Sequence, residues 1–126
     1  MVLYFDSDFP STLINTLRKL HKLPGSNRTI NIVHRESNLE DFDKNSTVVF
    51  LMDSNTRGVS IPTKKHFESG YKVFAFRDTE EDVTIFKLSL TILSFWKKIL
   101  VELQNSSEPF LKTFGYKSRG LTPVKN

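Results

Sequence analysis

The chain has 126 residues, a formal net charge of +4 and no cysteine. This length is typical of a single domain with an ordinary hydrophobic core, and the lack of thiols excludes cysteine catalysis, disulfides and thiolate-bound zinc, while oxygen ligands for a hard cation remain. No stretch approaches the roughly 20 apolar residues of a membrane span, so we expect a cytoplasmic protein without membrane contact.

The chain opens with four apolar residues in succession, Val2–Phe5, which predict a strand buried on both faces. The run ends abruptly at Asp6. Pro10 then precedes a helix over Ser11–Leu20, whose apolar residues recur at helical spacing. Asp6 is therefore expected at the carboxyl end of a central strand, where open α/β sheets bind ligands.

Two further strands follow the first helix. Thr29–His34 is rich in β-branched residues, and Thr47–Met52 is a second uninterrupted apolar run that ends in acid, at Asp53. The segment between them, Arg35–Lys44, is polar and acid-rich, and we expect a short helix there at Leu39–Asp43. Two buried strands that each end in aspartate indicate a shared site more strongly than either aspartate alone.

The second half of the chain continues this alternation. A brief helix over Thr63–Glu68 leads to a strand over Tyr71–Phe76, and a last strand covers Pro109–Phe114. Between these strands lies a long helix over Val83–Leu103. Because this helix is apolar around most of its circumference, it predicts either wide burial or contact with a second subunit in a homodimer.

The alternation predicts an α/β domain with a mainly parallel central sheet of four to five strands, helices on both faces and right-handed crossovers. The excess of positive charge lies at the C-terminal end of the sequence. Residues 1–110 contain 14 Lys and Arg and 14 Asp and Glu, so the whole net positive charge comes from the residues after 110. We therefore expect the domain at 1–114 and a basic tail at 115–126, which either contacts phosphates or is solvated.

Carboxylates are expected to converge at one edge of this sheet, because parallel strands present their carboxyl ends together. Asp6, Asp53 and Asp78 each follow a strand, and the acid-rich segment would add one of Glu40, Asp41 and Asp43. Packed carboxylates repel each other unless a cation lies among them. Oxygen ligands suit Mg²⁺ or Mn²⁺, which can orient a water and neutralise a phosphoryl oxygen, so the pattern predicts metal-assisted phosphodiester hydrolysis.

Some of these residues have a simpler interpretation. Asp78, or Thr79 beside it, could merely cap the long helix. A group of basic residues after Asp53 and in the tail could bind RNA phosphates, although the same side chains would suit a solvated surface. That group consists of Arg57, Lys64, Lys65, His66, Lys117 and Arg119.

Taken together, these stretches resemble the PIN domain superfamily, and within it the PIN-like domains of VapC-type toxins. The resemblance covers nearly the whole chain. It is carried by Leu3–Asp6 with Leu13–Leu17, by Ile32–His34 with Glu40–Asp43, by Val48–Asp53 with Gly70–Phe74, and by Phe95–Ile99 with Pro109–Leu111.

The resemblance implies a PIN-like three-layer fold and a ribonuclease with a four-acid site that binds Mg²⁺ or Mn²⁺, commonly dimeric and commonly neutralised by an antitoxin. Asp6 and Asp53 match the family pattern best. Asp43 is favoured over Asp41 as the second acid, and Asp78 takes the fourth position. We therefore expect the toxin of a toxin–antitoxin pair, acting on RNA.

Two other interpretations remain. A receiver domain of two-component signalling would hold Mg²⁺ at Asp6 and Asp8 and accept phosphate at Asp53, but the lysine expected after a fifth strand is missing, since Lys112 lies within that strand. A PIN-like subunit without catalysis would instead bind RNA or a protein through the long helix and the basic tail. A nuclease should need metal, Asp6 and Asp53, a receiver should need Asp53, and a binding subunit should tolerate the loss of either.

Overall fold

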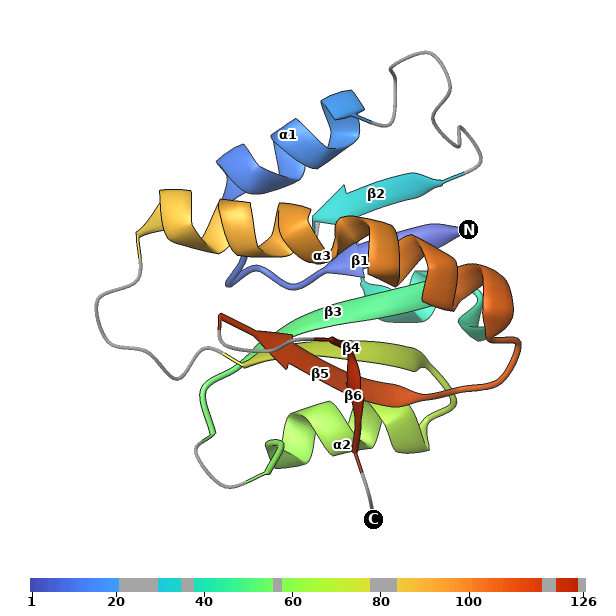
Figure 1. The fold of residues 1–126 in the computed structure, drawn as a ribbon. Coiled ribbons are helices and arrows are strands. Elements are labelled where there is room, and N and C mark those ends of the chain that lie inside the picture. Colours follow the sequence, from blue (N-terminus) through green and yellow to red (C-terminus); the bar gives the residue numbers. More distant parts are fainter. Residues whose placement is uncertain (21–29, 35–37, 56–57, 78–83, 117–119, 125–126) are drawn as a thin grey trace.

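In the described residues, the central sheet has six strands in the order β2-β1-β3-β4-β5-β6, and the first five in chain order run parallel (Figure 1). The computed structural model describes residues 1–20, 30–34, 38–55, 58–77, 84–116 and 120–124. The strands are β1 (Val2–Phe5), β2 (Asn31–His34), β3 (Thr47–Asp53), β4 (Lys72–Arg77), β5 (Leu111–Gly115) and β6 (Thr122–Pro123). The α/β class and the mainly parallel sheet are thus confirmed.

The sheet has six strands in the described residues, whereas four to five were expected. The short strand β6 runs antiparallel to β5 and comes from residues that the charge distribution assigns to the basic tail. Beside it, the backbone N–H of Val124 donates to the carbonyl of Leu111 at 2.9 Å. Leu121 packs against the core on one face of the sheet and Val124 against the core on the other. Part of the segment 115–126 therefore lies against the sheet.

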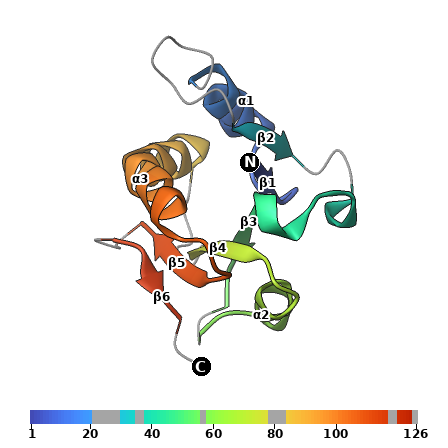
Figure 2. The same ribbon diagram turned by 90° about the vertical axis from the view of Figure 1, so that its right-hand side faces the viewer.

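Helices cover the two faces of the sheet unequally (Figure 2). One face, called here the α3 face, carries α1 (Ser11–Leu20) and α3 (Ile85–Asn105). The opposite α2 face carries α2 (Ile61–Glu68) and two single-turn 3₁₀ helices, η1 (Leu39–Asp41) and η2 (Lys44–Ser46). Since the described part of the β2–β3 connection contains only these short turns, the α2 face is the less completely covered one.

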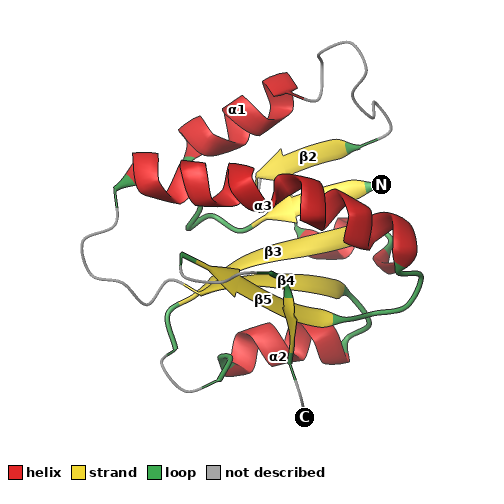
Figure 3. Cartoon of the chain, viewed as in Figure 1, coloured by secondary structure: helices red, strands yellow, loops and turns green. Residues whose placement is uncertain are grey.

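The α3 face holds the larger core, which is built around phenylalanines. Phe5 and Phe50 stack with ring centroids 4.3 Å apart, and Trp96 lies 6.4 Å from Phe5. Helix α3 lies across the strands (Figure 3) and buries a single stripe of side chains against them. That stripe consists of Leu88, Ile92, Phe95, Trp96, Ile99 and Leu103.

The α2 face holds a smaller core of shorter side chains. Side chains alternate between the faces along each strand, so β3 and β4 place Phe50 and Phe74 on the α3 face but Val49, Val73 and Ala75 on the α2 face. All of these residues are buried. The near-continuous apolar strands of the sequence therefore do report a sheet covered on both sides.

The β1–α1–β2 and β4–α3–β5 crossovers have opposite hands. This contradicts the expectation that all crossovers are right-handed. Helices α1 and α3 pack on the same face, yet the step from β1 to β2 and the step from β4 to β5 run in opposite directions across the sheet. The β3–α2–β4 unit shares the hand of β1–α1–β2, so β4–α3–β5 is the exception to the usual right-handed rule. On that face, the 21-residue α3 packs its buried stripe beside the ten-residue α1.

Helix α2 begins two residues earlier than predicted, at Ile61. Ser60 is its cap: the Ser60 hydroxyl oxygen accepts a hydrogen bond from the backbone N–H of Thr63. Pro62 fits the first turn, where a missing N–H costs nothing. The helix therefore starts at Ile61, ahead of the predicted Thr63.

Helix α3 begins two residues later than predicted, at Ile85. Its cap is Thr84, whose hydroxyl oxygen accepts from the backbone N–H of Lys87 at 3.1 Å. The capping role expected for Asp78 or Thr79 is therefore wrong, and both of those residues lie outside the described part of the chain. None of the helices in the described residues is long and apolar enough to cross a membrane.

Candidate active-site groove

A groove lies where the strand order of the sheet reverses. From β1 the chain first moves outward to β2 and then returns to β3 on the other side of β1. Open α/β sheets bind ligands at such a switch point, near the carboxyl ends of the strands. Here the α2 face is open between the η1 segment and α2, and the groove has a volume of about 960 Å³. Small-ligand sites commonly have volumes of this order.

Several segments line this groove. β1 and β3 supply Tyr4, Val49 and Leu51, whereas the segment around η1 and the helix α2 form the other lining surfaces. The described lining residues with ionisable side chains are Tyr4, Asp6, Glu40, Asp41, Lys44, Lys65, His66 and Tyr71. Three carboxylates therefore share one space with two ammonium groups and an imidazole, a combination that suits an anionic ligand and a cation together.

Asp6 lies half-buried just after β1. Its backbone N–H donates to the carbonyl of Phe50 at 3.1 Å, which extends the β1–β3 pairing by one residue. Its Oδ1 accepts the backbone N–H of Asp8 at 2.7 Å. The other carboxylate oxygen, Oδ2, accepts no hydrogen bond from the described part of the chain, so it retains its capacity for a ligand.

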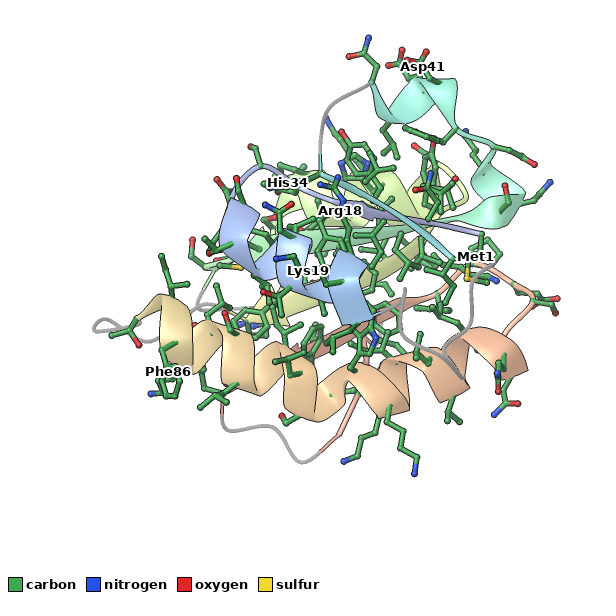
Figure 4. The ribbon with its side chains drawn as sticks, turned by 90° about the horizontal axis from the view of Figure 1, so that it is seen from above. Met1, Arg18, Lys19, His34, Asp41 and Phe86 are labelled. Atoms are coloured by element: carbon green, nitrogen blue, oxygen red, sulfur yellow. The ribbon has the colours of Figure 1, made fainter. Side chains whose placement is uncertain are left out.

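Asp41 brings a second carboxylate to the groove from a different part of the chain. It is exposed on η1, and Figure 4 places it on the opposite side of the molecule from α3 and Phe86. Glu40 precedes it in the same turn. Asp43 does not line the groove: its Oδ1 accepts the backbone N–H of Asn45 at 3.2 Å and so caps η2. Asp41, and not the favoured Asp43, therefore lines the same groove as Asp6.

Helix α2 supplies the basic side of the groove. Pro62, Lys65, His66 and Ser69 are spaced so that they share one side of the helix, and all four line the groove. Burial lowers the pKa of His66, although the negative charge of Asp6 acts in the opposite direction. The imidazole is therefore neutral at neutral pH. Lys64 is exposed and does not line the groove, so of this adjacent lysine pair only Lys65 is positioned for a bound ligand.

Asp53 is at the end of β3 as predicted, but it does not line the groove. Its side chain is only 2% exposed. Oδ1 accepts the backbone N–H of Asn55 at 3.0 Å, and Oδ2 accepts the backbone N–H of Ser60 at 2.8 Å and the hydroxyl of Thr63 at 3.0 Å. Burial by itself would raise the pKa of Asp53, but these hydrogen bonds outweigh it, and the pKa is lowered. The carboxylate is thus a charged, internally satisfied group.

The acids therefore do not all converge as predicted: Asp6, Glu40 and Asp41 line the groove, whereas Asp43 and Asp53 do not. Asp6 follows β1 and Asp53 is the last residue of the neighbouring β3, which extends three residues beyond the Phe5–Phe50 pair. Among the remaining predicted site residues, several lie outside the described part of the chain and stay predictions. These are Asp78, Arg57, Lys117 and Arg119.

Sequence reasoning missed Lys44 and Tyr71 as parts of the groove. The Tyr71 hydroxyl donates to the carbonyl of Leu39 at 3.5 Å, and Lys44 Nζ lies 5.5 Å from the centre of the Tyr71 ring. These contacts exist because the segment that holds η1 and η2 folds over the start of β4. No periodic pattern or motif in the sequence predicts such a contact between a turn and a distant strand. The only sequence signal for Lys44 is its position next to the acid-rich segment.

The groove acids fit a hydrated divalent ion better than a fully protein-bound one. Within the described residues, no group of three or more acidic or histidine side chains is arranged to hold a metal ion. Mg²⁺ usually keeps several waters and takes only one or two carboxylates from the protein. Asp6 and Asp41, which both line the groove, are the candidate carboxylates for such an ion.

Comparisons of the chain with protein-family models, with curated proteins and with solved structures found no match. Function must therefore be inferred from the groove itself.

Proposed function

We propose that this protein is a PIN-like, Mg²⁺- or Mn²⁺-dependent ribonuclease that hydrolyses RNA phosphodiesters in the groove. The observation that carries the proposal is that Asp6, Asp41 and Lys65 line one groove, which lies over the switch point of the sheet. These residues come from three separate segments, and together they provide both ligand types that a metal–phosphate pair requires.

The chain's own residues take distinct roles in this proposal. Asp6 and Asp41 would hold the ion, which when bound polarises a phosphoryl oxygen and makes a water more acidic. Lys65 and Lys44 bind the phosphate as point charges. His66, kept neutral by burial, is available to accept a proton from the attacking water at neutral pH.

A neutralising partner is part of the same proposal. The start of α3 exposes Ile85, Phe86 and Leu90, and the Phe86 side chain is 73% exposed. An exposed apolar patch of this kind is typical of a protein contact. It supports the role of a toxin whose partner is an antitoxin protein, or a second copy of the chain, at α3.

A receiver-like function has one observation in its favour and two against it. The strand order 2-1-3-4-5 is that of receiver domains. However, a phosphoryl acceptor must be accessible, and both oxygens of Asp53 are buried in hydrogen bonds. In addition, Lys112 forms a salt bridge with Glu102 near the C-terminal end of α3, so its ammonium group is not available at the groove. We therefore favour hydrolysis.

The test uses matched pairs of residues on the two walls of the groove. Asp6→Asn and Asp41→Asn should each abolish or strongly weaken Mn²⁺ binding in calorimetry and stop RNA cleavage, whereas Asp43→Asn, two residues away and outside the groove, should do neither. Lys65→Ala should raise the KM for RNA, and Lys64→Ala should leave it unchanged. If the unmodified protein takes up no Mn²⁺ and cuts no RNA, the hydrolase proposal fails and a binding subunit remains.

A further inference from the structure

Asp53 occupies a different place in the fold from the groove acids. Because Phe5 pairs with Phe50, Asp6 is level with Leu51, and Asp53 is one same-face step farther along β3. Two residues of strand correspond to roughly 6–7 Å. At that distance beyond the end of β1, the Asp53 carboxylate binds Asn55 and, at the start of α2, Ser60 and Thr63 instead of lining the groove.

The hydrogen bonds of Asp53 all go to the start of α2 or to the loop before it. Ser60, whose N–H donates to Asp53, is the cap of the helix, and Thr63, whose hydroxyl donates to the same oxygen, lies in its first turn. Thr63 is itself only 2% exposed. A single buried carboxylate oxygen therefore binds two positions of one helix, which fixes both the height of the helix and its rotation about its own axis.

That rotation decides which side chains reach the groove. Thr63 and Phe67 are one turn apart and face the sheet, where Phe67 packs against the smaller core. The groove-lining positions Pro62, His66 and Ser69 occupy the neighbouring side of the same helix. Turning α2 by one residue would exchange these sides.

The loop before α2 is held from a second direction as well. Arg77, at the end of β4, donates from its guanidinium to the carbonyls of Gly58 and Asn55. Asp53 binds the N–H groups of this loop and Arg77 binds its carbonyls, so the two side chains hold opposite polar groups of one backbone segment. Such an arrangement is expected where a loop must present a helix in one orientation.

We propose that Asp53 is a positioning residue, which acts on the groove through α2 and does not bind the metal ion. This inference rests on the proposed function, since it assigns to one of the strand-end acids a part other than the one that the family resemblance implies. The carboxylate of Asp53 sets the orientation of α2, and α2 carries Lys65 and His66 to the phosphate.

Three variants separate positioning from metal binding. Asp53→Asn keeps the shape of the side chain but presents an amide group to donors, and Thr63→Val removes one of those donors without touching any carboxylate. If Asp53 acts through α2, both variants should speed amide hydrogen exchange in residues 59–69 and lower RNA cleavage by roughly 10- to 100-fold. Both should leave the Mn²⁺ affinity, measured by calorimetry, unchanged.

Asp6→Asn is the matched opposite: it should remove Mn²⁺ binding and leave hydrogen exchange in α2 as it was. The positioning role is overturned if Asp53→Asn abolishes Mn²⁺ binding, or if exchange in residues 59–69 is unaltered in both Asp53→Asn and Thr63→Val. A failure of the ribonuclease proposal looks different, because then neither Mn²⁺ uptake nor cleavage is seen in the unmodified protein, while exchange in α2 still reports the role of Asp53.

Discussion

The lowered pKa of Asp53 makes a prediction for the acid stability of the protein. Because the folded-state pKa lies below the ordinary value of 3.8, the unfolded chain binds this proton more readily. The stability that the carboxylate contributes is therefore complete above about pH 5 and is lost as the pH falls toward the folded-state pKa. Asp53→Asn lacks this term, so its free energy of unfolding should fall less steeply below about pH 5.

Urea denaturation at several pH values measures this difference. The slopes of the free energy of unfolding against pH can differ between the two proteins by at most about 1.4 kcal/mol per pH unit, which corresponds to one proton. Glu102 provides a reference, because the hydrogen bond from Lys112 also lowers its pKa, and Glu102→Gln should remove a separate part of the same acid transition. Parallel profiles for the unmodified protein and Asp53→Asn would contradict the prediction.

At the scale of single residues, the sequence located strand-end acids better than it located their roles. Asp6 and Asp53 both follow apolar runs, and both were placed correctly at the carboxyl ends of β1 and β3. What separates them is the three-residue overhang of β3 and the donors at Ser60 and Thr63. Pairing register and loop conformation are tertiary properties, so a pattern of apolar residues followed by acid cannot report them.

The contact between β4 and β5 leads to a prediction about packing between neighbouring elements. A Cβ added at Gly115 would lie 3.1 Å from the carbonyl oxygen of Arg77 and 3.2 Å from its Cβ. Because both contacts involve atoms fixed by the paired strands, Gly115→Ala should destabilise the protein by about 1–3 kcal/mol in urea denaturation. It should also disturb the loop that Arg77 holds.

Gly120→Ala is the control for this prediction. A Cβ at Gly120 would meet nothing within 4 Å, so the change should stay within about 0.5 kcal/mol of the unmodified protein. Equal effects of the two substitutions would show that β4 and β5 are less closely packed at this end than the structure shows.

Helix boundaries show which local signals carry information at the scale of elements. The strands and the helix α1 were predicted closely because apolar runs and helical spacing are local patterns. The predicted start of α3 differs from the observed one because Asp78 and Thr79 satisfy the cap preference as well as Thr84 does. Where several nearby residues are good caps, the sequence alone does not select one; in the structure the cap is Thr84, and Leu88 is the first buried side chain of the helix.

The hand of the β4–α3–β5 crossover illustrates what can be known only for the whole molecule. The sequence predicts the length of α3 and its apolar stripe, but not the face of the sheet on which it lies. In the structure α3 shares one face with α1 and adds to the larger core, while α2 covers the smaller core on the other face. The same imbalance leaves the groove open on the α2 face, so the candidate site is a consequence of how two unequal layers share one sheet.

The final segment of the chain gives the prediction that belongs to the whole molecule. A solvated basic tail could be removed without cost, but β6 pairs with β5, and Leu121 and Val124 pack against the two cores. Deleting residues 117–126 should therefore destabilise the protein by about 2 kcal/mol, because two partly buried side chains are lost. It should also promote aggregation, since the edge of β5 becomes free to pair with another chain.

Charge and packing in this segment can be separated with a second variant. Replacing Lys117, Arg119 and Lys125 by glutamine removes three positive charges and keeps β6 in place. If the segment also contacts RNA, this variant should bind RNA with a weaker dependence on salt concentration, because fewer counterions are released, while urea denaturation stays unchanged. A deletion variant as stable and as monomeric in light scattering as the full chain would instead mean that the sheet effectively ends at β5, and that the segment contributes through its charge alone.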